Sequence, residues 1–227
     1  MHAAFRWAVP PDFNIAQACC GRWARETPDA IAIHHETEDG ARRRISYGQL
    51  QQEANRLSHV LRDLGVQRGD RIAIVMPQRP ETAVAQIAIH QLGAIAMPLA
   101  MMFGPDALEY RLQNSEAALA IVDEGGIDNL LLARPQCPLL RTVIAVGRAQ
   151  GRGDIDWDPA LAQQPTTFTP VTTAADDPAI LIYTSGTTGP AKGALLPQRA
   201  LLGNLPGFIC SQNWFGFNPA LGTSPRP

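Results

Sequence analysis

Residues 179–193 read AILIYTSGTTGPAKG, an apolar run followed by a loop that is rich in glycine and hydroxyl side chains and holds one lysine. The run over 179–183 is typical of a buried β-strand. The glycines let the backbone curl so that successive N–H groups converge on an anion, while the hydroxyls donate hydrogen bonds and the lysine adds a positive charge. Hydrogen bonds to charged groups contribute about 1.5–3 kcal/mol each. The stretch therefore predicts a strand that leads into a binding loop for a polyphosphate.

The spacing of the loop differs from that of a Walker A motif, in which the lysine directly follows the last glycine and a serine or threonine comes next. Here Pro190 and Ala191 separate Gly189 from Lys192, and Gly193 stands where the hydroxyl residue belongs. The alternative of an unrelated, kinase-like nucleotide enzyme is therefore disfavoured. The sequence has neither the Walker A motif of such an enzyme nor an aspartate that would partner it in binding magnesium. A polar, glycine-rich surface loop without a ligand is the remaining alternative.

Strands and helices are expected to alternate along most of the chain. Ser46 is a typical helix N-cap, the apolar side chains that follow it share one helix face, and Gly65 closes the helix. The strand over 71–76 is apolar throughout, as parallel strands buried on both faces are. The expected strands are 30–33, 42–45, 71–76, 94–99, 118–122, 141–146 and 179–183, and further helices begin at Glu81 and Pro105. This order predicts an α/β fold, a mostly parallel sheet flanked by helices on both faces.

Three stretches do not fit this alternation. Residues 147–178 contain several prolines and glycines and are interpreted as a long surface connection that includes some irregular helix. Residues 216–227 show no periodicity and are expected to be an unstructured tail. Residues 82–104 carry no formal charge and are long enough to cross a bilayer. Their glutamines, with Gly93 and Pro98, favour a buried helix followed by a strand.

The composition is typical of a globular chain. Of its 227 residues, 45% are hydrophobic and 18% are charged. A net charge of −2 predicts no general attraction to nucleic acid or to an anionic membrane. Cys19, Cys20, Cys137 and Cys210 show no metal-ligand spacing, and the adjacent pair cannot easily form a disulfide with each other. Because the N-terminus lacks a secretion signal, the cysteines favour a reduced, cytoplasmic setting and buried structural roles.

The loop resembles the phosphate loop of adenylate-forming (AMP-dependent) synthetases, a family of acyl-CoA synthetases, luciferases and adenylation domains of peptide synthetases. The signature of that family is Ser/Thr-Gly-Thr-Thr-Gly followed at this spacing by Lys-Gly, as in residues 185–193. The resemblance covers residues from about 13 to 215. Further motifs that carry it are YGQL at 47–50, NRL at 55–57, LGVQRGDR at 64–71, LGA at 92–94, PL at 98–99 and DPA at 177–179. The chain is thus similar to the first part of the family's large N-terminal domain.

The resemblance implies a set of site residues and a reaction. The residues that contact the ATP phosphates are then Thr184, Ser185, Gly186, Thr187, Thr188, Gly189 and Lys192. Lys192 is also the expected catalytic residue, because it neutralises charge on the leaving phosphates. The implied reaction joins a small-molecule carboxylic acid to ATP as an acyl-adenylate, from which the thiol of coenzyme A takes the acyl group. The motif YRLQ at 110–113, with Ser115, is similar to the branch that activates medium-chain fatty acids.

Several features depart from the family. Many members carry two histidines just after the loop, where this sequence has Leu196 and Gln198. The sequence also lacks the family's Tyr-Gly-x-Thr-Glu motif for adenine and magnesium, its aspartate for the ribose, and its C-terminal domain with a catalytic lysine. No metal ligand is therefore assigned, and of the expected cofactors ATP, Mg²⁺ and coenzyme A, the last two have no site here. His34, His35 and His59 are expected to be structural or solvated.

Two classes of function stay open. In the first, residues 1–215 are part of the AMP-binding domain of an acyl-CoA ligase, and the chain is a truncated form with little activity alone. In the second, the chain is a non-catalytic module that binds nucleotide phosphate or serves as an interaction partner. The unpatterned tail favours the first, because the resemblance stops abruptly before it. The sequence says nothing about the oligomeric state.

Overall fold

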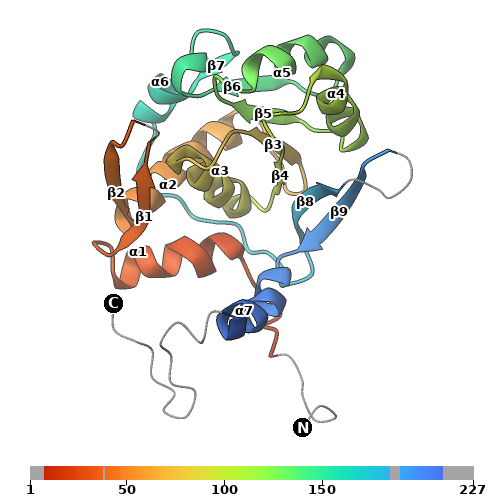
Figure 1. The fold of residues 1–227 in the computed structure, drawn as a ribbon. Helices are drawn as coiled ribbons and strands as arrows, with labels where there is room; N and C mark the ends of the chain where they lie inside the picture. The colour runs from red at the N-terminus through yellow and green to blue at the C-terminus, as the bar shows by residue number, and fades with distance from the viewer. Residues whose placement is uncertain (1–7, 38, 185–189, 212–227) are drawn as a thin grey trace.

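The computed structural model describes residues 8–37, 39–184 and 190–211. Over these residues one sheet has seven strands in the order β7-β6-β5-β3-β4-β8-β9 (Figure 1). All neighbouring pairs in it are parallel except β8 and β9, which are antiparallel. The strands are β3 (Arg71–Val75), β4 (Ile95–Pro98), β5 (Leu119–Val122), β6 (Thr142–Ala145), β7 (Ile155–Asp156), β8 (Pro178–Thr184) and β9 (Lys192–Pro197). The expected α/β fold with a mostly parallel sheet is confirmed.

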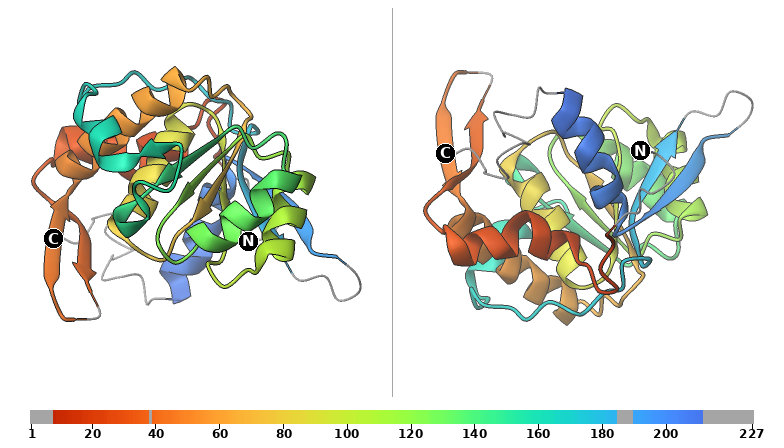
Figure 2. Two further views of the ribbon diagram at one scale, coloured as in Figure 1. Left: turned by 90° about the horizontal axis from the view of Figure 1, so that it is seen from above. Right: turned by 90° about the horizontal axis from the view of Figure 1, so that it is seen from below.

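Helices cover both faces of this sheet, as expected (Figure 2). One face packs against α2 (Tyr47–Asp63), α3 (Pro80–Gln91) and α6 (Trp157–Ala162), and the other against α4 (Pro105–Asn114) and α5 (Ile127–Ala133). Successive side chains of β3 alternate between these two cores. Ile72 and Ile74 lie in the first core, and Ala73 and Val75 lie in the second. The central strands β3 and β5 are almost entirely apolar because both of their faces are buried.

The N-terminal part adds a π-helical turn (Gln17–Gly21), α1 (Arg22–Glu26) and a separate antiparallel hairpin, β1 (Ile31–Glu36) and β2 (Arg42–Ser46). Helix α2 follows β2 directly. The backbone N–H of Gln49 donates to Ser46 Oγ at 3.2 Å, and the N–H of Ser46 donates to Gln49 Oε1 at 2.9 Å. This reciprocal capping box confirms Ser46 as the N-cap. Gly65, with φ of 80°, ends the helix in a conformation that favours glycine.

The connection over 147–178 holds more structure than its composition suggests. Where some irregular helix was expected, it contains a short α-helix, α6, and it also contains β7, which extends the main sheet beside β6. The remainder is tied to α2. The side-chain amide of Asn55 donates to the carbonyl oxygen of Thr166. The Nε2 atom of His59 lies 2.7 Å from the carbonyl oxygen of Thr167. His59 is therefore structural, as expected.

The uncharged stretch 82–104 forms most of α3 and then β4, in agreement with the sequence prediction of a buried helix and a strand. Among the described residues, no helix combines the length and apolar character needed to span a bilayer. Among the helices and strands that the structure describes, α1, α5, β7, β9 and a helix that follows β9, α7 (Ala200–Ser211), were not expected from the sequence. Strand β9 pairs with β8, so the predicted phosphate loop connects the two strands of a β-hairpin.

Candidate functional site

The predicted phosphate loop joins β8 to β9. Ser185, Gly186, Thr187, Thr188 and Gly189 lie outside the described residues. The described members of the set are Thr184, the last residue of β8, and Lys192, the first residue of β9. Both are exposed, and they are direct cross-strand partners. The structure therefore brings the two ends of the predicted site together.

The side chains of Thr184 and Lys192 project from the same face of the hairpin, because directly opposed residues of antiparallel strands share a face. Among the ion pairs of the described residues, Lys192 takes part in none. An exposed hydroxyl and an ammonium group without a carboxylate partner among these residues suit an anion such as a phosphate. The geometry thus fits the chemistry assigned to these two residues.

Gly193, which follows the lysine in the motif, has a packing role of its own. It pairs with Tyr183 across the hairpin. A Cβ atom at this position would lie 3.0 Å from Leu181 Cδ1 and 3.3 Å from Tyr183 Cζ. The glycine therefore lets the Tyr183 ring lie close over β9.

Sequence reasoning missed the contacts that α4 makes with this hairpin. The hydroxyl of Tyr110 donates to the carbonyl oxygen of Ala191 at 2.9 Å, and the hydroxyl of Tyr183 donates to Asn114 Oδ1 at 2.7 Å. Burial raises the pKa of Tyr183, so its hydroxyl stays protonated and can donate at neutral pH. The spacing of Tyr110 and Asn114, four residues apart in a helix, was the available signal that they share a face.

Leu196 and Gln198 occupy the positions where many members of the family carry histidines. Gln198 is fully buried. Its Oε1 accepts a hydrogen bond from the backbone N–H of Ile15 at 2.9 Å, while its Nε2 has no partner among the described residues. Gln198 therefore connects the end of β9 to the beginning of the chain.

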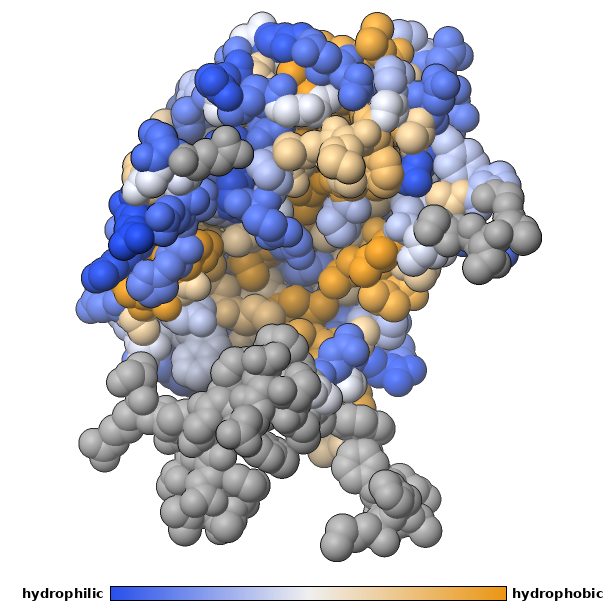
Figure 3. Space-filling model, viewed as in Figure 1, coloured by the Kyte–Doolittle hydropathy of each residue, from blue (hydrophilic) through white to orange (hydrophobic). Residues whose placement is uncertain are grey.

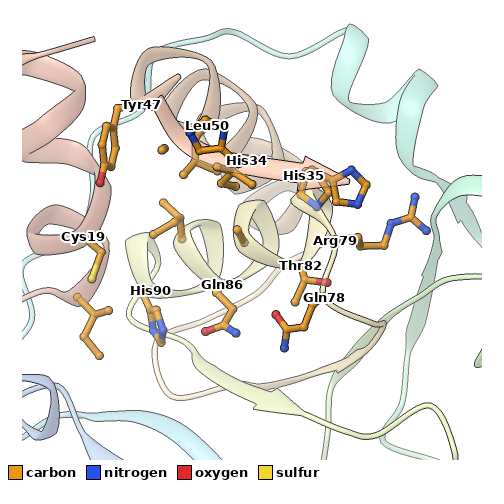
Figure 4. Close-up of a pocket in the computed structure, with 16 residues that line it drawn as sticks. Cys19, His34, His35, Tyr47, Leu50, Gln78, Arg79, Thr82, Gln86 and His90 are labelled. Atoms are coloured by element: carbon orange, nitrogen blue, oxygen red, sulfur yellow. The ribbon is translucent and has the colours of Figure 1, made fainter. Parts of the chain in front are cut away.

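A separate cavity of about 520 Å³ lies between β1 and α3 (Figure 4). Its walls are mostly apolar, and Figure 3 shows apolar side chains gathered in the hollow over α3. His90, from α3, is 1% exposed, and neither of its ring nitrogens has a partner among the described residues. Burial lowers its pKa to about 4, so the ring is neutral at pH 7. No described residue of the β8–β9 hairpin lines this cavity, which is therefore distinct from the predicted phosphate site.

Charged groups also meet at the carboxyl ends of β3 and β5. Arg79 donates to Asp123 Oδ2 at 3.2 Å and to Glu81 Oε2 at 2.8 Å, and it lies 3.6 Å from Glu124 Oε2. The Asp123 side chain is buried. Arg79 thus serves three carboxylates, of which Glu124 also pairs with Arg148. Within the described parts of the chain, no group of three or more histidine, cysteine, aspartate or glutamate side chains is arranged to hold a metal ion.

The cysteines show no sign of reactivity in the described residues. Cys20 and Cys137 are buried, Cys19 is exposed, and all three are free thiols. Burial raises the pKa of Cys20 to about 12, so it remains a neutral thiol. The expectation of buried structural cysteines therefore holds for Cys20 and Cys137, whereas the side chain of Cys210 is outside the description.

Comparison with known proteins identifies the family. The model of the family described as AMP-binding enzyme matches residues 20–224. The chain belongs to the AMP-binding enzyme family. This confirms the resemblance to adenylate-forming synthetases. The hairpin with Thr184 and Lys192 thus lies within the matched AMP-binding enzyme region.

Relatives of this AMP-binding enzyme chain are longer than the chain. An acetyl-coenzyme A synthetase of Novosphingobium aromaticivorans is 36% identical over 208 residues, which make up 84% of this chain and 32% of that protein. One from Nostoc linckia is 34% identical over 209 residues, covering 85% of this chain and 62% of its own length. The chain therefore spans less than two thirds of either relative.

Solved structures agree on the fold. A Brucella canis acyl-CoA synthetase superposes with a TM-score of 0.80 at 26% identity, over 91% of this chain and 39% of that one. An anthranilate CoA ligase in complex with anthranoyl-AMP gives a TM-score of 0.77 at 24% identity, over 87% of this chain and 37% of that one. The second likeness concerns the fold alone.

Proposed function

We propose that the β8–β9 hairpin binds the phosphates of ATP during the activation of a carboxylic acid by an acyl-CoA synthetase. The observation that carries this proposal is the placement of Thr184 opposite Lys192, both exposed, at the two ends of a glycine- and hydroxyl-rich segment. Membership in the AMP-binding enzyme family supports it. The roles of Ser185, Gly186, Thr187, Thr188 and Gly189 are part of the same proposal.

The first step of the proposed reaction needs positioning and charge neutralisation from this chain, and no proton transfer. A carboxylate oxygen of the acid attacks the α-phosphorus of ATP, and the bond from that phosphorus to the bridging oxygen breaks as pyrophosphate leaves with the electron pair. The ammonium of Lys192 balances the charge that grows on the leaving phosphates, and the hydroxyl of Thr184 donates a hydrogen bond to them. In the second step the sulfur of coenzyme A attacks the acyl carbon and its S–H proton passes to solvent, while the bond from that carbon to the phosphate oxygen breaks and AMP leaves with the electron pair.

Mg²⁺ and coenzyme A enter the proposal only as expected reactants. The described residues hold no cluster of side chains suited to a metal ion, so no step here is assigned to metal ligands of this chain. No residue is assigned to coenzyme A.

We propose a fatty acid as the acid, on the basis of YRLQ at 110–113 with Ser115. The named relatives are acetyl-coenzyme A synthetases, so acetate is the alternative to compare. To distinguish a fatty acid from acetate, the exchange of labelled pyrophosphate into ATP is measured with acetate, octanoate and dodecanoate. The protein assayed is the longest one that contains this sequence. Exchange with acetate alone would contradict a fatty acid.

We also propose that residues 1–227 alone bind ATP without turnover, because the match covers only 32% of the length of the Novosphingobium aromaticivorans acetyl-coenzyme A synthetase. The purified chain is then expected to show no pyrophosphate exchange with any acid, and exchange above background would contradict this. A translation of the gene beyond codon 227 in all three frames, searched for Tyr-Gly-x-Thr-Glu, tests whether the chain is a truncated form. Its free thiols favour the cytoplasmic location that we include in the proposal.

A further inference from the structure

Helix α4 contacts both strands of the hairpin next to the residues assigned to phosphate. The Tyr110 hydroxyl holds the carbonyl of Ala191, and Asn114 holds the hydroxyl of Tyr183. Ala191 immediately precedes Lys192, and Tyr183 immediately precedes Thr184. Each contact is therefore made one residue away from a group that the proposed function assigns to ATP.

The contact to Ala191 acts where the strand ladder stops. The last cross-strand pair of the hairpin is Thr184 with Lys192, so Ala191 lies beyond it. Strand β9 is also at the edge of the main sheet and pairs only with β8 among the described strands. The Tyr110 hydroxyl is thus a second attachment for the start of β9, in addition to the β8 ladder.

The part of α4 that makes these contacts is itself well anchored. Leu108 and Leu112 of α4 are 0% and 1% exposed in the core beneath it. The rings of Tyr110 and Tyr183 meet edge to face, with centroids 6.5 Å apart. Between the two polar contacts, the Arg111 guanidinium lies 5.7 Å from the Tyr183 ring centroid. A helix fixed in this way can hold the hairpin in one place relative to the sheet.

We propose that Tyr110 and Asn114 are positioning residues that hold Lys192 and Thr184 in place to bind phosphate. The proposal rests on the proposed function of the hairpin. Neither residue is assigned a contact with ATP. They act through the backbone at Ala191 and the side chain of Tyr183, and a small displacement of a binding group is enough to weaken a site that depends on geometry.

Hydrogen exchange tests the structural half of this proposal without a ligand. Tyr110→Phe keeps the ring and removes only the hydroxyl that holds Ala191. In the full chain, amide exchange at residues 191–193 is expected to rise about fivefold, the effect of losing one neutral hydrogen bond, while exchange in β3 stays unchanged. The control is Tyr47→Phe, because the Tyr47 ring stacks on Trp23, and among the described residues no hydrogen bond or ring contact joins Tyr47 to the hairpin. Unchanged exchange at 191–193 in Tyr110→Phe would overturn the proposal.

ATP affinity, measured by calorimetry on the same proteins, tests the functional half. Tyr110→Phe is expected to weaken ATP binding about fivefold and Tyr47→Phe to leave it unchanged. Lys192→Ala is the reference variant, and its expected loss is tenfold or more. If Lys192→Ala weakens binding and Tyr110→Phe does not, the positioning role is wrong and the proposed function stands. If neither variant weakens binding, both are overturned.

A second variant covers the case in which Tyr110→Phe does not fold. Tyr183→Phe removes the hydrogen bond to Asn114 from the other strand and keeps the ring over Gly193. It is expected to weaken ATP binding several-fold, and Asn114→Ala is expected to have no further effect when combined with it, because both remove one shared contact. Full additivity of the two changes would contradict the role of Asn114.

Discussion

The ring of Tyr183 lies over Gly193 so closely that a Cβ atom on the glycine would come within 3.3 Å of Tyr183 Cζ. This contact joins β8 to β9 at the base of the predicted phosphate loop. It also gives the glycine of the Lys-Gly motif a role in packing, independent of any ligand.

Gly193→Ala is therefore expected to destabilise the chain. The new methyl group must displace Tyr183 or Leu181, and overpacking of this kind costs about 1–3 kcal/mol. Urea unfolding measures the difference. Gly203→Ala is the control, because a Cβ there meets no atom within 4 Å and alanine favours the helix by about 0.5–1 kcal/mol. Equal effects of the two substitutions would argue against the close packing of Gly193.

Arg79→Met is expected to lower the free energy of unfolding by about 3–5 kcal/mol, because it leaves the buried Asp123 carboxylate without its partner. Adding Asp123→Asn should recover part of that loss, which denaturant unfolding of the single and double variants measures. The exposed pair Arg42 and Glu36 provides the comparison, and Arg42→Met should cost less than about 1 kcal/mol. A similarly small cost for Arg79→Met would contradict the buried charge network.

His90 makes the stability depend on pH between 7 and 4. Burial lowers its folded-state pKa to about 4, below its ordinary 6.5, so the unfolded chain takes up a proton first as the pH falls. The contribution of neutral His90 to the free energy of unfolding is thus full above pH 6.5 and is lost as the pH falls toward 4. Between pH 7 and pH 5 the free energy of unfolding is expected to fall by on the order of 2 kcal/mol. His90→Leu should remove this part of the pH dependence in urea unfolding at the two pH values. The same slope in both proteins would show that His90 does not titrate as described.

Five strands of the main sheet, β3, β4, β5, β6 and β8, and the helices α2, α3 and α4 could be predicted because their signals are local. The apolar runs of β3 and β5 and the capping box at Ser46 each depend on a few adjacent residues. Strand β9 gave no such signal. Its first four residues are all exposed, so its sequence does not alternate between apolar and polar residues as that of a half-buried strand does. Strand β7 has only two residues and is held by its neighbour β6.

Part of the candidate site could also be predicted, because some of its residues are adjacent in the sequence. Thr184 and Lys192 belong to one contiguous motif, and the structure places them opposite each other. The contact of Tyr110 with Ala191 joins residues 81 positions apart, and it depends on how α4 packs on the sheet. No local pattern in the sequence contains that information.

The most direct test uses the fact that Lys192 is the only lysine in the sequence. An amine-selective reagent can therefore label only Lys192 and the N-terminal amine, and mass spectrometry separates the two. ATP and inorganic tripolyphosphate are expected to protect Lys192 from labelling, while adenosine does not and the N-terminal amine reacts at the same rate throughout. If ATP left the labelling of Lys192 unchanged at concentrations up to several millimolar, phosphate binding by this hairpin would be contradicted.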